Sequence, residues 1–593
     1  MKSLSDLRRT RAGRAALAVI SALPVAAALA LVIYYILGPG EGYFHSDCTD
    51  SIVWANATVE SGKIFDPDFK YAALLPFSAS AWMVPLIRIF GYGMTAHNIA
   101  MIIFAVIFAA SVWFCFRSFG MGRGFCGIAT FAVLMLLSSS DKLREIMWGH
   151  VIYYSIGLCV LFFTLGIAAR LLDGGTSRRR YVMLIVLMAL LSAGAATDGM
   201  QIIAIAILPT AAALIAERIF CGKDKLVSEA SVPSLSALIA VVGGTAVGML
   251  LLELMKNGVS AGYADAYSGW SSPTEWGGNA QRFFRHFMTL MGLNVVERDS
   301  LFAAASFGNM IRIGISLVIL AAPLVMLVLY RRLSTIGACL CVWAHLVLSA
   351  VIIFGFICGK LSAANWRLTP IAGSAVLVTL VGAYELWLAG RRALSAPAGN
   401  ADGAAGTDKT GETDAAASGR VAARAGALLT AFVMLASLLP AATIAAMPTD
   451  YGSDNNLHRI IDFCRAHELE YGYATFWNGP AVTVLSDSDV TVRQINVDRV
   501  KGIYPYYYQS DLDWYADTSH DRYFVILTAS EAATAASSQT WQDLCSTYLT
   551  ECYDGSDRDD EGNPTEGIPG FRIYVFSENI LASTDWKEYY GVK

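Results

Sequence analysis

Charged residues are scarce in this sequence. Only 15% of its 593 residues are Asp, Glu, Lys or Arg, whereas 55% are hydrophobic. Soluble globular proteins carry about 25% charged residues, so this composition excludes a soluble enzyme of this length. The 11 cysteines include no Cys-x-x-Cys pair, which disfavours a zinc site. The net charge of −5 shows no basic excess, so the sequence implies no nucleic-acid partner.

Long apolar segments dominate the sequence instead. A helix needs about 20 apolar residues to cross the hydrocarbon core of a bilayer. Eleven segments approach this length, and they cover residues 15–37, 95–116, 122–140, 149–170, 181–197, 200–217, 234–254, 309–330, 335–357, 371–390 and 424–446. The sequence therefore predicts a polytopic α-helical protein of the lipid bilayer with about 11 transmembrane helices.

The basic residues between these segments predict the orientation of the chain. Cytoplasmic connections of membrane proteins are enriched in Lys and Arg. With the N-terminus in the cytoplasm and eleven crossings, the cytoplasmic connections contain Arg117 and Arg123; Arg170 and Arg178 to Arg180; Arg218, Lys223 and Lys225; Arg331 and Arg332; and Arg391 and Arg392. An even number of crossings would break this agreement. We therefore expect a multi-pass protein of the cytoplasmic membrane whose first segment is a retained anchor and whose C-terminal region lies outside the cytoplasm.

Four regions follow from this topology. Residues 1–390 form a transmembrane catalytic module with a long first outer loop at 38–94. Residues 391–423 are rich in Ala, Gly, Thr and Asp and predict a disordered cytoplasmic linker. Residues 424–446 form the last transmembrane helix. Residues 447–593 predict a small extracytoplasmic α/β domain, with a helix at 454–470 and strands at 471–477, 490–497, 523–528 and 571–576.

Two carboxylates lie in the first outer loop, in the sequence His45-Ser46-Asp47-Cys48-Thr49-Asp50. Acidic residues that are used chemically often lie in such half-buried, aromatic surroundings at the membrane boundary. We predict that Asp47 or Asp50 is a general base, with Asp47 favoured because it lies farther from the next helix. The alternative is that they cap this helix. His45 tunes this base, binds the sugar substrate or is an unused loop histidine.

Other charged residues are predicted to reach the same outer boundary. The predicted substrate-binding residues are His45, Glu145, His150, Asp198, Arg282, Arg285 and Arg367. The structural alternatives to substrate binding are surface ion pairing for Glu145 and anchoring to lipid headgroups for the arginines. Asp198 lies in a tight turn between two apolar segments, where an acid usually faces a polar cavity.

The outer regions contain three further features. Asp66-Pro67-Asp68 is foremost a turn signal. The segment 74–90 is too interrupted to span the membrane and predicts a helix in the interface that covers the site. In the C-terminal domain, Tyr504 and Tyr506 to Tyr508 form an aromatic cluster that either contacts an acceptor glycan or packs in the core.

The layout resembles the GT-C superfamily of integral-membrane glycosyltransferases, in particular bacterial members that use polyprenyl-phosphate sugars. The resemblance rests on the first-loop acids, on Asp66-Pro67-Asp68-Phe69-Lys70-Tyr71 in the same loop, and on Asn365-Trp366-Arg367-Leu368-Thr369-Pro370 before a late helix. It implies that Asp47 or Asp50 is the general base and that Arg367 holds the lipid phosphate. Asp50 is followed by Ser51, so the Asp-Glu pair of the protein mannosyltransferases is absent. No cofactor is assigned, and a role for a divalent metal stays open.

These observations predict a glycosyltransferase that moves a sugar from a polyprenyl-phosphate donor to an envelope polysaccharide, glycolipid or protein, with inversion. A transporter or flippase of a lipid-linked or polar envelope precursor is the alternative, and a non-catalytic scaffold is a third. Transporters usually place ionisable groups near the bilayer centre. The charged residues of this chain gather at one boundary, which favours the enzyme.

Overall fold

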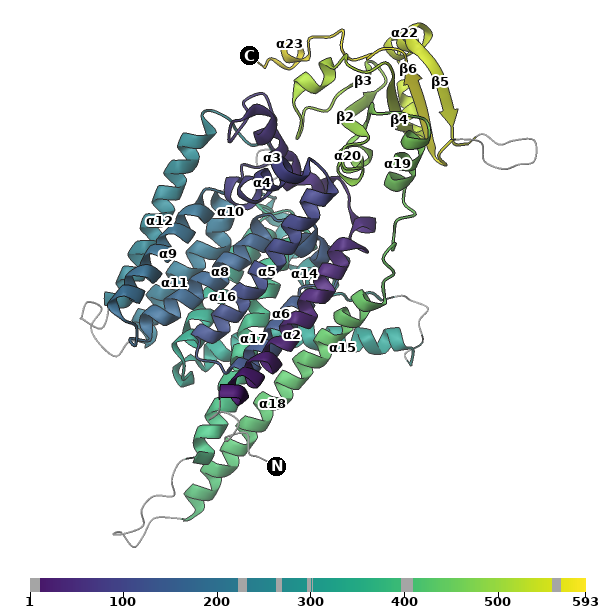
Figure 1. Cartoon of the computed structure of the whole chain (residues 1–593). Coiled ribbons are helices and arrows are strands. Elements are labelled where there is room, and N and C mark those ends of the chain that lie inside the picture. Colours follow the sequence, from purple (N-terminus) through teal and green to yellow (C-terminus); the bar gives the residue numbers. More distant parts are fainter. Residues whose placement is uncertain are drawn as a thin grey trace.

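The computed structural model describes residues 11–221, 232–262, 269–295, 300, 302–395, 409–556 and 567–592. A bundle of long helices makes up most of the chain, and a small sheet domain lies at one end of this bundle (Figure 1). The predicted polytopic helical protein with a C-terminal α/β domain is therefore confirmed.

Within the described residues, ten helices are long and apolar enough to cross a membrane. They are α2 (Arg11–Leu37), α5 (Met94–Ser118), α8 (Tyr153–Leu172), α9 (Arg178–Ala196), the α10–η6 run (Met200–Phe220), α12 (Val232–Lys256), α15 (Ala304–Val328), α16 (Ile336–Ile357), α17 (Thr369–Ser395) and α18 (Lys409–Ala446). An eleventh is present if α6 (Arg123–Leu136) and the segment Asp141–Gly149, which bend by 112°, count as one span. The predicted eleven spans, the odd number that the basic residues require, correspond to the second count, because the predicted span 122–140 contains α6.

Small residues allow the helices to approach closely. Gly244 and Gly248 of α12 face the carbonyl oxygens of Ala189 and Ala193 of α9, where a Cβ atom would clash with the backbone. Small residues at such contacts are typical of helix pairs in membranes, where van der Waals packing replaces the hydrophobic effect.

The linker before α18 is shorter than predicted. Helix α17 continues to Ser395, and α18 begins at Lys409, so residues 409–423 are helical and not disordered. The Ala content of this segment favours a helix. The rest of the predicted linker, residues 396–408, lies outside the described residues.

The first loop folds into short helices at the end of the bundle. These are η1 (Glu41–Tyr43), η2 (Ser46–Thr49), α3 (Asp50–Ser61), the π-helix η3 (Pro76–Ser80) and α4 (Ala81–Phe90). Helix α4 and the π-helix occupy the segment that we expected to form an interfacial helix. Helix α3 ends at Gly62, whose left-handed φ of 69° closes the helix without the strain a Cβ would cause.

The C-terminal domain contains a six-stranded sheet in the order β3-β2-β1-β4-β6-β5. Strands β2 (Thr491–Asp498), β1 (Tyr471–Thr475) and β4 (Tyr523–Thr528) are parallel, and β3 (Gly502–Pro505), β6 (Phe571–Phe576) and β5 (Leu549–Asp554) pair antiparallel. Helices α19 (Asn456–Ala466), α20 (Pro480–Leu485), α21 (Ala529–Ala535) and α22 (Gln539–Tyr548) accompany the sheet. The four predicted strands and the helix are present, whereas β3 and β5 were not predicted.

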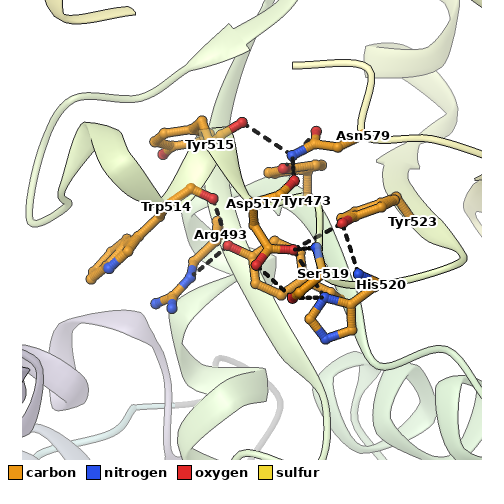
Figure 2. Close-up of polar contacts among 10 residues, drawn as sticks. Tyr473, Arg493, Trp514, Tyr515, Asp517, Ser519, His520, Tyr523 and Asn579 are labelled. Carbon is orange, nitrogen blue, oxygen red and sulfur yellow. Dashed lines mark hydrogen bonds and ion pairs between the residues drawn. The ribbon is translucent and has the colours of Figure 1, made fainter. Parts of the chain in front are cut away.

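A polar network holds the loop that leads into β4 (Figure 2). The Asn579 amide donates to the carbonyl oxygens of Tyr515 and Asp517 at 3.1 and 2.6 Å, and Tyr473 Oη donates to Asn579 Oδ1 at 2.8 Å. The Asp517 carboxylate accepts from Tyr523 Oη at 2.9 Å and lies 2.9 Å from His520 Nδ1. These bonds join the loop before β4 to β1, to β4 and to the segment that follows β6.

The C-terminal domain packs directly on the first loop. Ser46 Oγ donates to the Phe476 carbonyl at 2.5 Å, and Tyr507 Oη donates to the Asp68 carbonyl at 3.2 Å. The Lys70 N–H donates to the Ser510 carbonyl at 2.9 Å. The domain therefore covers the loop that carries the predicted general base.

Candidate active site

A cavity of about 210 Å³ opens where the first loop, the membrane bundle and the C-terminal domain meet. Its lining combines acids, bases and aromatic rings from distant parts of the chain. The lining residues are Asp47, Asp50, Trp54, Ala72, Ala73, Lys142, Glu145, Ile146, His150, Ile152, Tyr153, Tyr154, Gln201, Ala261, Trp366, Arg367 and Tyr508. Five of the nine predicted site residues therefore line one cavity.

The two first-loop aspartates enter this cavity from η2 and from the first turn of α3. Helix α3 begins at Asp50 with Thr49 as its N-cap residue, and the cap makes no side-chain hydrogen bond. The Asp50 carboxylate accepts from Gln509 Nε2 of the C-terminal domain at 2.8 Å. Burial, followed by the nearby charge of Asp47, raises the pKa of Asp50 to about 8. Burial also raises the pKa of Asp47.

Glu145 is surrounded by three basic side chains. It lies on the π-helix η4 (Glu145–Gly149), which follows the short helix α7 (Asp141–Arg144). Its carboxylate forms an ion pair with Lys142 and lies 3.4 Å from His45 Nε2 and 3.9 Å from His150 Nε2. The Asp47 N–H donates to His45 Nδ1 at 3.3 Å, which leaves Nε2 to carry the ring proton toward Glu145. Glu145 therefore holds these three basic side chains in place beside Asp47 and Asp50.

Buried polar atoms in the cavity wall lack protein partners. Among the described residues that line the cavity, four side-chain atoms are buried without a hydrogen bond: Trp54 Nε1, His150 Nδ1, His150 Nε2 and Gln201 Oε1. Native structures leave few buried polar atoms unpaired, so such atoms in a cavity wall are suited to a polar ligand.

Arg367 lies on η9 (Asn365–Leu368), directly before α17. Its side chain is 4% exposed. Arg367 donates to Tyr154 Oη at 2.5 Å and to Ser362 Oγ at 3.3 Å. Beside it, Lys142 Nζ lies 5.3 Å from the centre of the Trp366 ring. Arg367 and Lys142 thus supply two cations to one wall of the cavity.

Comparison with known proteins finds similarity in structure but not in sequence. No family model and no curated protein matches the sequence. Two crystal structures of ArnT from Cupriavidus metallidurans, one bound to undecaprenyl phosphate and one in the apo state, match with TM-scores of 0.50 and 0.51. Each match covers 95% of this chain and 98% of ArnT, at 11% and 12% identity. AglB from Archaeoglobus fulgidus, an archaeal oligosaccharyltransferase in complex with an inhibitory peptide and a dolichol-phosphate, matches with a TM-score of 0.40 at 11% identity, over 95% of this chain and 74% of AglB.

This chain has a GT-C-like fold. The predicted resemblance is confirmed at the level of the fold, from the first loop to the C-terminal domain.

Within the GT-C-like fold, Asp198 lies outside the cavity lining. It is 4% exposed, and its carboxylate accepts from the N–H groups of Phe77 and Ser78 at 2.8 and 2.9 Å. The buried acid therefore caps the first turn of the π-helix η3 and ties the first loop to the turn between α9 and α10 (Met200–Ile202). This contact accounts for an acid at that position without a substrate.

Replacing Asp198 with Asn tests this structural role. The Asn side chain offers one acceptor oxygen to two buried N–H donors, so one of them loses its partner. We expect a loss of about 1–3 kcal/mol in the free energy of unfolding, measured as a lower thermal midpoint of the purified protein. The KM for the substrate, measured below the transition, should stay unchanged. A raised KM with an unchanged midpoint would assign Asp198 to the substrate.

Three more predicted residues do not line the cavity. Arg282 and Arg285 are exposed on α14 (Pro273–Leu290), whose buried face contains Phe283 and Phe287. This amphipathic pattern is typical of a helix at a membrane interface. His45 is the third of these residues. Its Nε2 lies 3.4 Å from the Glu145 carboxylate, and its ring centre lies 6.2 Å from that of Trp477.

Sequence reasoning missed several lining and supporting residues. Gln201, Tyr153 and Tyr154 lie in apolar helices, where an amide or a phenol gives no pattern. Gln509 is a single neutral residue in the C-terminal domain, 459 positions from Asp50. Tyr508 belonged to the predicted aromatic cluster, and it is the member that lines the cavity.

The arrangement suits a reaction that removes a proton and develops negative charge on a leaving group. The same cavity is lined by two aspartates of raised pKa from the first loop and by the cations Lys142 and Arg367. Among the described residues, no group of three or more His, Cys, Asp or Glu is arranged to hold a metal ion.

Proposed function

We propose that this chain is a membrane glycosyltransferase that transfers a sugar from a polyprenyl-phosphate donor to an acceptor outside the cytoplasmic membrane. The acceptor is a hydroxyl-bearing or otherwise nucleophilic group of an envelope polysaccharide, glycolipid or protein. The observation that carries the proposal is the shared cavity of Asp47, Asp50 and Arg367 at the boundary of a GT-C-like bundle. The lipid-phosphate ligands of ArnT and AglB agree with this donor class.

We assign the general base to Asp50 and not to Asp47. A base works best when its pKa lies near the working pH. The pKa of Asp50, about 8, meets this condition, and its carboxylate is held by Gln509. Asp47 then acts on the base through its charge.

The transfer needs one displacement at the anomeric carbon. Asp50 accepts the proton of the acceptor hydroxyl, and the acceptor oxygen forms a bond to the anomeric carbon. The bond from this carbon to the phosphate oxygen breaks, and polyprenyl phosphate leaves with the electron pair and one additional negative charge. Arg367 and Lys142 stabilise that charge. Attack from the opposite face inverts the anomeric configuration.

The proposed orientation rests on the basic ends of the helices. The Thr95 N–H, at the start of α5, donates to Asp487 of the C-terminal domain at 3.0 Å. Arg117, in the last turn of α5, lies 22 residues after Thr95 and therefore about 33 Å away along the helix axis, at 1.5 Å per residue. Basic residues at that end favour the cytoplasmic side, which supports an extracytoplasmic location of the cavity and of the C-terminal domain.

A reconstituted assay tests the proposal. The purified protein in liposomes receives a panel of radiolabelled polyprenyl-phosphate sugars and envelope extracts as acceptors. We expect release of free polyprenyl phosphate and label in the acceptor fraction with one donor, and no transfer with the Asp50→Asn protein. Donor that crosses the bilayer chemically unchanged, with no label in any acceptor, would show a flippase instead.

A further inference from the structure

The C-terminal domain extends a short segment into the cavity region. Residues 508–511 run antiparallel to residues 69–70 of the first loop. The Gln509 N–H donates to the Lys70 carbonyl at 2.8 Å, the Lys70 N–H donates to the Ser510 carbonyl at 2.9 Å, and Phe69 forms a β-bridge with Asp511. The position of Gln509 is therefore defined by both the domain and the loop.

Gln509 is held firmly and in an uncommon conformation. Its side chain is 3% exposed, and its φ is 51°, in the left-handed region that a Gln rarely adopts. From β2, the buried Gln494 donates through Nε2 to the carbonyl oxygens of Tyr508 at 2.7 Å and Gln509 at 2.8 Å. Residues strained in this way persist only where their surroundings hold them, and they cluster at functional sites.

The Gln509 side chain makes one hydrogen bond that reaches the proposed reaction. Its Nε2 donates to Asp50 Oδ1 at 2.8 Å. One carboxylate oxygen of Asp50 thus accepts a hydrogen bond from the Gln509 amide. The second carboxylate oxygen remains to take the proton of the acceptor hydroxyl.

We propose that Gln509 is a positioning residue that orients the Asp50 carboxylate, so that the active site is complete only when the C-terminal domain is docked on the first loop. This inference rests on the proposed function, because it assigns a role to Gln509 in that reaction. The domain is then a working part of the catalytic centre as well as a cover over it.

Domain docking alone does not explain this contact. Several other bonds join the domain to the loop, including Ser46 to Phe476, Tyr507 to Asp68 and Thr95 to Asp487. Loss of one side-chain amide leaves them in place. The Gln509 side chain therefore affects the carboxylate more than it affects docking.

The Gln509→Asn protein separates positioning from folding. Asn adopts the left-handed conformation more readily than Gln, so we expect thermal stability equal to or above that of the wild type. Its amide is one methylene shorter and no longer reaches Asp50. We expect kcat to fall about 10- to 100-fold, as for a catalytic group displaced by about 1 Å, with the donor KM unchanged. Gln509→Met, which keeps the length and removes the donor, should lose activity similarly.

The pH profile gives a second readout that a purely structural role would not move. The Gln509 bond lowers the pKa of Asp50 against the effect of burial. Its removal should therefore shift the rising limb of log kcat to higher pH. The matched control is Tyr507→Phe, which removes another bond between the domain and the loop and should keep the wild-type kcat and profile. A wild-type profile in both Gln509 proteins, or an equal loss in Tyr507→Phe, would overturn the proposal.

A spectroscopic titration distinguishes failure of this inference from failure of the proposed function. The carboxylic acid band of Asp50, assigned in infrared difference spectra by its absence from Asp50→Asn, should titrate at higher pH in Gln509→Met than in the wild type. This measurement needs no turnover. If the wild type transfers no sugar but the band shifts as expected, the glycosyltransferase proposal fails and the Gln509 contact stands; an unshifted band refutes the contact.

Discussion

Replacing Asp50 with Asn is expected to lower kcat by about 10²- to 10⁴-fold, the range that general base catalysis contributes. Asn has nearly the same shape and keeps an oxygen that can accept from Gln509 Nε2, so the cavity should keep its form. It has no carboxylate to take the acceptor proton. The measurement is the initial rate of label transfer in liposomes, with thermal unfolding as the check on folding.

The wild-type rate should depend on pH through the same group. The ionised carboxylate is the active form, and the pKa of Asp50 is raised from 3.8 to about 8. Below pH 8 most of the base is protonated, so log kcat should rise with pH by about one unit per pH unit and level off above about 8.

Asp47→Asn is the matched control for Asp50→Asn. Asp47 lies three residues away in the same loop and lines the same cavity. Its charge raises the pKa of Asp50, so its removal should move the rising limb to lower pH and leave most of the activity at high pH. Full activity in Asp50→Asn with a large loss in Asp47→Asn would transfer the role of base to Asp47.

Much of the fold follows from two physical regularities that a single sequence displays. Apolar segments of membrane length and the one-sided distribution of basic residues predicted the helical bundle and the separate C-terminal domain. Local details did not follow. Helix α18 begins at Lys409 because Ala-rich segments propagate helices, although the composition of 391–423 suggested a disordered linker. The edge strand β5 alternates half-buried and exposed residues and carries little apolar signal.

The predictable part of the site is its charged part. Charge at a membrane boundary costs solvation free energy, and this cost is the reason why charged residues there were predicted to form the site. The cavity contains five of them: Asp47, Asp50, Glu145, His150 and Arg367. The free-energy cost of burying a charge does not by itself distinguish a ligand site from a structural contact. Asp198 is buried more deeply than Asp47, Asp50 and Glu145, but its partners are backbone N–H groups, which no sequence pattern reveals. Neutral amides such as Gln509 carry no such cost and depend on tertiary pairing.

Arg367 is expected to have the second-largest effect. Loss of one preorganised group that stabilises developing charge costs about 10²- to 10³-fold in kcat. Arg367→Ala should show a loss in this range. Arg367→Lys keeps the charge but loses the planar fork that matches a phosphate, so we expect a smaller loss. Product inhibition by free polyprenyl phosphate gives a second measurement, since its inhibition constant should rise in both proteins.

The alternative role of Arg367 is an anchor between membrane and bundle. Its bond to Tyr154 Oη allows a matched test, because Tyr154→Phe removes this bond and retains the guanidinium. If Arg367 binds phosphate, Tyr154→Phe should leave most of kcat and of the product inhibition. Arg282→Ala, at an exposed arginine of α14, should leave both unchanged. An anchor would lower the thermal midpoint in Arg367→Lys and leave the inhibition constant at its wild-type value. That result would remove Arg367 from the phosphate site and leave Lys142 as the cation to test there.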